Sequence, residues 1–362
     1  MTAISIESVR RRIRQIDSMP LFSHERYHFA IETVRQADVL KNPDLQFETR
    51  YDLCMAATTV GEYQVSLDTF TWCITQYDRY PDRFSLLWLF RMYKWMIADA
   101  IEFPSIGREQ ILSLLEDFGE RLRASGGSER AYWFYRDRVA YDLKDFQFLK
   151  ENLFRWREHP RDQFCDCPAC EEDFRISFFS FLGEYESAIK VSEGIIHQKM
   201  KCASVPHRTF AEILHPLLEL GLTEKAHEAH VKGYRMIYDK PGLASCVFDH
   251  IEYLILTGDL KKAASLFEKH LGDALEMSGP ASFHVPLITW LLTERLLSQG
   301  KKRIKLRLPS RLDFFQPSGV YDIKQLRTHF KTITKDLATR FDTRNGNTFH
   351  GNEIQRVIWG KE

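Results

Sequence analysis

The sequence lacks a long apolar run. No uncharged apolar stretch reaches about 18 residues, the length that a membrane-spanning helix needs. The segment Met1–Pro20 also lacks the apolar core of a signal peptide, because it carries four arginines on a helical pattern, Arg10, Arg11, Arg12 and Arg14. We therefore expect a cytoplasmic chain without a membrane partner.

An excess of charge of one sign is also missing. The 50 Lys and Arg residues balance the 50 Asp and Glu residues, which gives a net charge of 0. Dedicated nucleic-acid binders usually carry a basic excess, so we do not expect a nucleic-acid partner. Only 13 prolines and 18 glycines occur in 362 residues, which argues against a long disordered segment.

Strand patterns and catalytic motifs are scarce. The sequence contains no glycine-rich phosphate loop, no two-histidine zinc-protease motif and no strand-turn-helix serine elbow, so we expect a protein that is not an enzyme. Apolar residues instead recur at helical spacing, as in Ile213, Leu214, Leu217 and Leu218. This periodicity predicts an all-α protein.

A repeated pattern runs through the chain: a turn glycine, an apolar residue two positions later and a small residue five positions later. The glycine ends one helix, and the small residue lies where two antiparallel helices cross. With weaker turns near residues 103, 144 and 300 included, successive turns lie about 40 residues apart. We therefore predict a right-handed solenoid of about seven or eight stacked helix pairs; a non-repetitive helical bundle is the alternative. The clearest windows are Gly61 with Ser66, Gly183 with Ala188, Gly221 with Ala226, and Gly258 with Ala263.

The window from Gly258 to Phe267 resembles the tetratricopeptide repeat, whose usual unit is about 34 residues and thus shorter than the units here. Segments 202–209, 229–235 and 341–347 are similar to a family of tetratricopeptide-like proteins from Gram-positive bacteria. This resemblance covers roughly the C-terminal half. It implies a fold of paired helices without implying a reaction.

The pattern changes after Gly300, where a basic stretch with two prolines begins. We expect a solenoid over 1–300, a basic linker over 301–321, and a C-terminal capping helix with a tail over 322–362. Asp322 is the predicted N-cap of that helix, and residues 344–347 are predicted to form the turn that stops it.

Three cysteines lie within six residues, at positions 165, 167 and 170. Two cysteines separated by two residues can both reach one tetrahedral zinc ion, which would need two further ligands. The predicted ligands of a structural zinc are Cys167, Cys170, Cys202 and His207. Cys165 and His159 are reserve ligands; reduced, partly buried thiols and a redox pair are the alternatives.

The first helices of the pairs are predicted to line a concave face, with side chains ten and six residues before each turn pointing into it. Aromatic rings mixed with charges suit a protein or peptide partner. The alternative is that these side chains pack on one another. The predicted partner-binding residues are Tyr51, Tyr93, Phe134, Arg138, Asp173, His215 and Glu252.

These features together predict a non-catalytic scaffold that binds a protein or peptide on its concave face. The alternatives are a peptide-responsive regulator, whose superhelix changes pitch with a ligand, and an immunity protein that neutralises a cognate toxin. The sequence does not separate these roles.

Overall fold

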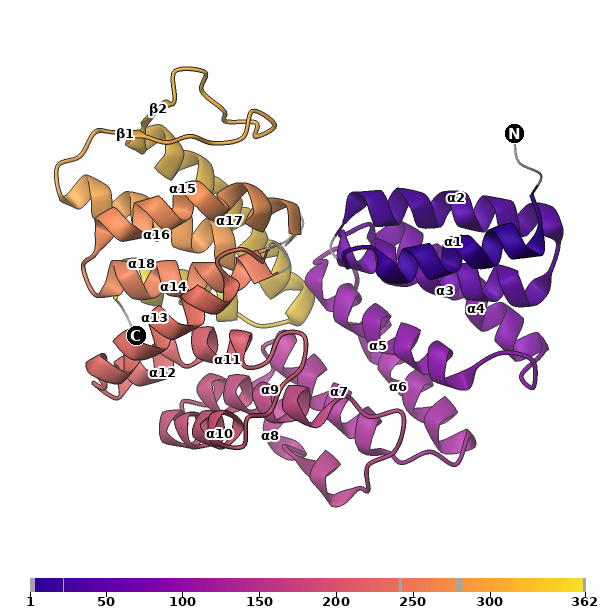
Figure 1. Cartoon of the computed structure of the whole chain (residues 1–362). Coiled ribbons are helices and arrows are strands. Elements are labelled where there is room, and N and C mark those ends of the chain that lie inside the picture. The colour runs from indigo at the N-terminus through magenta and orange to yellow at the C-terminus, as the bar shows by residue number, and fades with distance from the viewer. Residues whose placement is uncertain (1–3, 22, 241–242, 278–281, 361–362) are drawn as a thin grey trace. The chain divides into compact units, whose positions relative to one another are not determined.

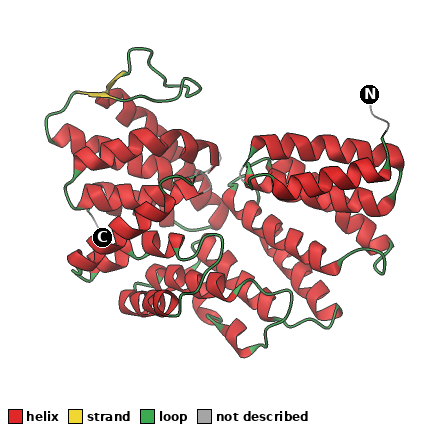
Figure 2. Ribbon diagram, viewed as in Figure 1, coloured by secondary structure: helices red, strands yellow, loops and turns green. Residues whose placement is uncertain are grey.

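The computed structural model describes residues 4–21, 23–240, 243–277 and 282–360. Helices dominate these ranges, and the strands found in them form one short two-stranded antiparallel sheet (Figure 2). The predicted all-α fold built from antiparallel helix pairs is therefore confirmed.

The chain separates into two compact units. Unit 1 comprises Met1–Val139 with Phe154–Cys165, and unit 2 comprises Ala140–Leu153 with Asp166–Glu362. The predicted boundaries at residues 300 and 321 both fall inside unit 2, and they remain predictions.

Unit 1 is built from helices that pack in sequence order: α1 against α2, α3 against α4, and α5 against α6 (Figure 1). Its core is rich in aromatic rings, since Phe90 lies edge-on to Phe118 at 5.6 Å and to Phe164 at 4.8 Å. The elements are α1 (Ile6–Ser18), α2 (His24–Leu40), α3 (Pro43–Thr59), α4 (Tyr63–Arg79), α5 (Leu86–Glu102), α6 (Arg108–Ala124), most of α7 (Arg130–Asp142) and the 3₁₀ helix η1 (Arg155–Glu158).

Unit 2 continues the paired plan (Figure 1). Its elements are α8 (Phe146–Glu151), α9 (Pro168–Phe181), α10 (Tyr185–His197), α11 (His207–Glu212), α12 (Leu214–Glu219), α13 (Thr223–Ile237), α14 (Ala244–Leu256), α15 (Leu260–Met277), α16 (His284–Ser298), β1 (Arg303–Lys305), β2 (Val320–Asp322), α17 (Ile323–Asn345) and α18 (Phe349–Trp359). Helix α9 packs on α10, α11 on α13, α14 on α15, and α16 on α17. Helix α14 also contacts α11, α12 and α16, so the first helices of successive pairs are neighbours.

The predicted turns and crossings are present. Gly258 has a φ of 88°, and a Cβ built there would meet no atom within 4 Å, so the backbone conformation alone calls for glycine. The glycines of the other clear windows share a positive φ. The small residues five positions later are all fully buried: Ser66, Ala188, Ala226 and Ala263.

The basic segment after Gly300 packs on unit 2. Strands β1 and β2 pair with Arg303 opposite Asp322. Farther along the segment, Pro309 lies so close to Gly272 of α15 that a Cβ on that glycine would come within 2.7 Å of the proline ring. Gly272 is therefore needed because the segment approaches α15 closely.

The C-terminal helix begins as predicted and is followed by a helix that the sequence analysis assigned to a tail. The Asp322 side chain accepts a hydrogen bond from the Gln325 backbone N–H at 3.1 Å, and Gly346 ends α17 with a φ of 70°. The carboxylate of Asp342 then accepts the backbone N–H of His350 at 2.9 Å in the first turn of α18. Residues 349–359 thus form a second helix, α18, within the range 322–362, whose bounds remain a prediction.

The crossing at Ala263 can be tested with Ala263→Trp. The methyl group is fully buried between α14 and α15, so we expect an indole there to lower the free energy of unfolding by at least about 1 to 3 kcal/mol in urea denaturation. Lys261→Trp, on an exposed position of α15, is the matched control. An Ala263→Trp chain as stable as this control would show that the crossing does not need a small residue.

Candidate functional site

The predicted partner-binding residues of unit 1 belong mainly to its packing. Tyr93 and Phe134 are 0% and 1% exposed, so the packing alternative holds for these two rings. Tyr51 is half-buried and stacks on Trp88 with 4.9 Å between ring centroids. The guanidinium of Arg138 lies 5.1 Å from the centroid of the Tyr135 ring. Because buried rings cannot reach a partner, Tyr93 and Phe134 offer no binding face, whereas Tyr51 and Arg138 remain predictions.

The predicted residues of unit 2 lie in a group of charged side chains. Asp173 of α9 is fully buried, and its carboxylate lies 2.6 Å from Arg208 of α11. Arg208 also contacts Glu212 at 3.0 Å, and the Ser177 hydroxyl donates to Glu212 at 2.6 Å. Burial raises the pKa of Glu212 to about 8, and the nearby Asp173 adds to the shift. Asp173 therefore positions Arg208 rather than meeting a partner itself.

A second group joins α14 to the start of α16. Asp249, Glu252 and His284 place their ligand atoms within 4.8 Å of one another, and His284 Nε2 lies 3.1 Å from the Asp249 carboxylate. Burial raises the pKa of Glu252 to about 7. Burial opposes the charge on His284, but the hydrogen bond to Asp249 and the nearby carboxylates outweigh it and raise its pKa to about 9.

A third group joins α12 to α18. Arg356 donates from Nη1 to His215 Nε2 at 2.9 Å and contacts the Glu353 carboxylate at 2.6 Å. Burial and the adjacent guanidinium lower the pKa of His215. The imidazole thus accepts this bond as a neutral ring.

Charges in the three groups shift one another's pKa values. Asp249 raises the pKa of Glu212, whereas Glu353 raises and Arg356 lowers the pKa of Glu252. We call the set the polar cluster. Its carboxylates outnumber its guanidinium groups, and all members except Asp173 keep some solvent exposure. The polar cluster consists of Asp173, Arg208, Glu212, His215, Asp249, Glu252, His284, Glu353 and Arg356.

Sequence reasoning found Asp173, His215 and Glu252 but missed the other six members. Glu212 and Asp249 both stand nine residues before a turn glycine, one position after the residues ten before the turn from which binding residues were predicted. Reading that position as well would have found them. Glu353 and Arg356 carried no such signal, because α18 had not been recognised as a helix.

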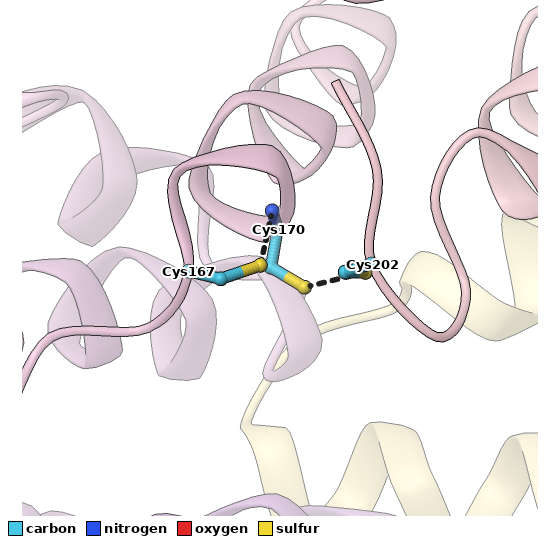
Figure 3. A group of neighbouring side chains, drawn as sticks. All are labelled: Cys167, Cys170 and Cys202. Carbon is cyan, nitrogen blue, oxygen red and sulfur yellow. Dashed lines mark hydrogen bonds between the residues drawn. The ribbon is translucent and has the colours of Figure 1, made fainter. Parts of the chain in front are cut away.

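The structure also brings three of the four predicted zinc ligands together (Figure 3). Cys167 is the N-cap of α9, Cys170 lies in its first turn, and Cys202 lies in the loop before α11. The sulfurs are within 4.8 Å of one another, and those of Cys170 and Cys202 are 3.2 Å apart. Burial raises the pKa of the Cys170 thiol. Burial acts in the same direction on Cys202, but backbone N–H groups and neighbouring side chains outweigh it and lower the Cys202 pKa.

His207, the fourth predicted ligand, is not part of this group in the described residues. Its Nε2 accepts a hydrogen bond from Lys240 Nζ at 2.6 Å instead. Burial and that ammonium group lower the pKa of His207. The reserve ligands belong to unit 1, where the Cys165 thiol donates to Asp162 at 3.4 Å and His159 stacks on Trp133.

Comparisons with known proteins add little about function. No family model matches the chain, and no curated protein matches it. Among solved structures, the chain is similar to a Rap protein complexed with competence and sporulation factor, at 12% identity and a TM-score of 0.49, over 97% of this chain and 98% of that one. A likeness at this level carries no conclusion about function. Within the described ranges, no helix is both long and apolar enough to cross a bilayer.

The raised pKa of His284 predicts a pH dependence. Its folded pKa of about 9 lies above the usual value of about 6.5, so its stabilising contribution is complete below about pH 6.5 and is lost as the pH rises through about 9. His284→Gln should therefore lower the free energy of unfolding more at about pH 6 than at about pH 10, measured by urea denaturation.

His197→Gln changes an exposed histidine on α10, outside the polar cluster, and is the matched control for this measurement. An equal loss of stability at both pH values in His284→Gln would contradict the ion pair between His284 and Asp249.

Proposed function

We propose that this chain is a non-catalytic scaffold that binds a protein or peptide through the polar cluster of unit 2. The observation that carries the proposal is the convergence of charged side chains from the first helices of successive pairs, α9, α11, α12, α14 and α16, with α18 beside them. Burying so many charges costs folding free energy that apolar side chains would not cost. A binding surface gives these charges a role that core packing does not.

The charge balance points to a cationic group on the partner. The five carboxylates of the cluster face three cationic groups, the two guanidinium groups and the imidazolium of His284, and the pKa values of Glu212 and Glu252 are raised to about 8 and about 7 by burial. A Lys or Arg side chain, or a free amino terminus, would stabilise the ionised carboxylates. The partner we infer is therefore a basic segment of a protein or peptide.

Exposure separates the members that can contact a partner from those that cannot. Asp249 and His284 have side chains that are 34% and 39% exposed, whereas Asp173 has none of its side chain exposed. Contacts with a basic partner are thus assigned to the carboxylates of Asp249 and Glu252, while His284 pairs with Asp249 and Asp173 holds Arg208. No observation favours the peptide-responsive regulator or the immunity protein over a simple scaffold, and the absence of enzyme activity remains a prediction.

Binding can be tested with short synthetic peptides and the full chain. We expect peptides that carry Lys or Arg to bind at least tenfold more tightly than matched peptides with Glu at the same positions. Added salt should weaken this preference, because charge attraction supplies it. Glu252→Gln should lower the affinity for the best basic peptide by about tenfold, or about 1.4 kcal/mol, in isothermal titration calorimetry.

Glu228→Gln removes a carboxylate from an exposed position of α13, outside the polar cluster, and is the matched control. The proposal fails if basic and acidic peptides bind equally, or if Glu252→Gln and Glu228→Gln bind the best peptide as tightly as the unchanged chain does.

A further inference from the structure

The three cysteines of unit 2 converge from two separate segments. Cys167 and Cys170 come from the start of α9, and Cys202 comes from the loop that precedes α11. Cys167 is exposed, whereas Cys170 and Cys202 are partly buried against the main apolar core of the unit. An ion could therefore reach the sulfurs from solvent on one side while packed side chains hold them in place on the other.

Backbone N–H groups donate hydrogen bonds to two of these sulfurs, as they do to thiolates. Cys202 Sγ accepts the N–H groups of Ser204 at 3.4 Å and of Val205 at 3.3 Å. Cys167 Sγ, at the N-terminus of α9, accepts the N–H of Cys170 at 3.3 Å. Backbone donors and a helix N-terminus both favour a negatively charged sulfur, and the thiolate is the form that binds metal.

The spacing of the sulfurs suits one tetrahedral ion. A zinc ion bound at about 2.3 Å to each sulfur would hold the sulfurs about 3.8 Å apart. The sulfurs of Cys170 and Cys202 are 3.2 Å apart, and all three lie within 4.8 Å of one another, so small side-chain shifts would suffice. A disulfide between Cys170 and Cys202 would leave Cys167 without a role and would not use the N–H donors that favour thiolates.

We propose that Cys167, Cys170 and Cys202 bind one zinc ion as thiolates, with a solvent molecule as the fourth ligand. No other histidine, cysteine or carboxylate in the described ranges joins the three sulfurs, and His207 is held by Lys240. The ion ties the start of α9 to the loop before α11. Asp173 lies on α9, and Arg208 lies on α11 directly after that loop, so the zinc site also supports the ion pair between Asp173 and Arg208.

Elemental analysis of the full chain, purified without a metal-affinity column, tests the site directly. We expect about one zinc per chain, as a single mononuclear site requires. Cys167→Ser, Cys170→Ser and Cys202→Ser should each lose the zinc. Cys246→Ser, which changes a buried thiol of α14 outside the group, should keep it.

His207→Gln distinguishes three protein ligands from four. The proposal predicts that this variant keeps its zinc, whereas loss of the ion would make His207 a ligand and overturn the open fourth position. Where the serine variants fail to fold, the unchanged chain is stripped with a chelator and titrated with Zn²⁺ against a chromogenic competitor. One equivalent should bind, and iodoacetamide should alkylate the three thiols only in the stripped chain.

The site would be overturned by a chain that contains no zinc as isolated and takes up none when Zn²⁺ is added. It would also be overturned if the chain isolated without reductant held a Cys170–Cys202 disulfide and bound no zinc after reduction. Neither result would affect the peptide-binding test, because the basic peptides are measured on the polar cluster.

Discussion

Four of the helix pairs depend on a close crossing at a small, fully buried residue. Where two helices approach at Ala226 or Ala263, a larger side chain would hold the helix axes apart and leave the flanking apolar residues partly exposed. The turn glycine that precedes each crossing sets the angle at which the second helix returns. This arrangement brings the first helices of neighbouring pairs side by side, and the functional features of unit 2 follow from that contact.

Because α11, α12, α14 and α16 lie side by side, their facing side chains either complete an apolar core, if they are apolar, or form a polar group, if they are charged. In unit 1 the equivalent positions hold Tyr93 and Phe134, and these rings complete the core. In unit 2 Asp173 stands at the same distance before its turn, and His215 and Glu252 stand six residues before theirs. These three side chains cannot be buried together without partners. Two arginines and the imidazolium of His284 neutralise part of this charge, and burial raises the pKa values of Glu212 and Glu252. Proteins often keep such unfavourable charge where they bind another molecule.

The sequence predicted the features that depend on local residue type. A glycine with a positive φ and a small residue at a crossing leave a recognisable pattern, so the turns at Gly61, Gly183, Gly221 and Gly258 could be located in advance. Three cysteines could be grouped because Cys167 and Cys170 have the spacing of a metal motif.

Features that depend on packing between distant elements were harder to predict. Spacing placed His207 near the cysteines, but it does not say which way a side chain turns, and His207 turns to Lys240. The same spacing rule named Tyr93 as a binding residue, because a periodic pattern does not reveal how tightly unit 1 fills its interior. Helix α18 supplies Glu353 and Arg356 from more than a hundred residues beyond His215, a contact that only the folded chain reveals.

The central claim is that the polar cluster is a binding surface and not only a means of holding unit 2 together. Hydrogen–deuterium exchange of the full chain, with and without the tightest-binding basic peptide, tests it most directly. The claim predicts slower exchange in α12, α14, α16 and α18 when the peptide is present. Slower exchange confined to unit 1, or to α13 and α15, would contradict it.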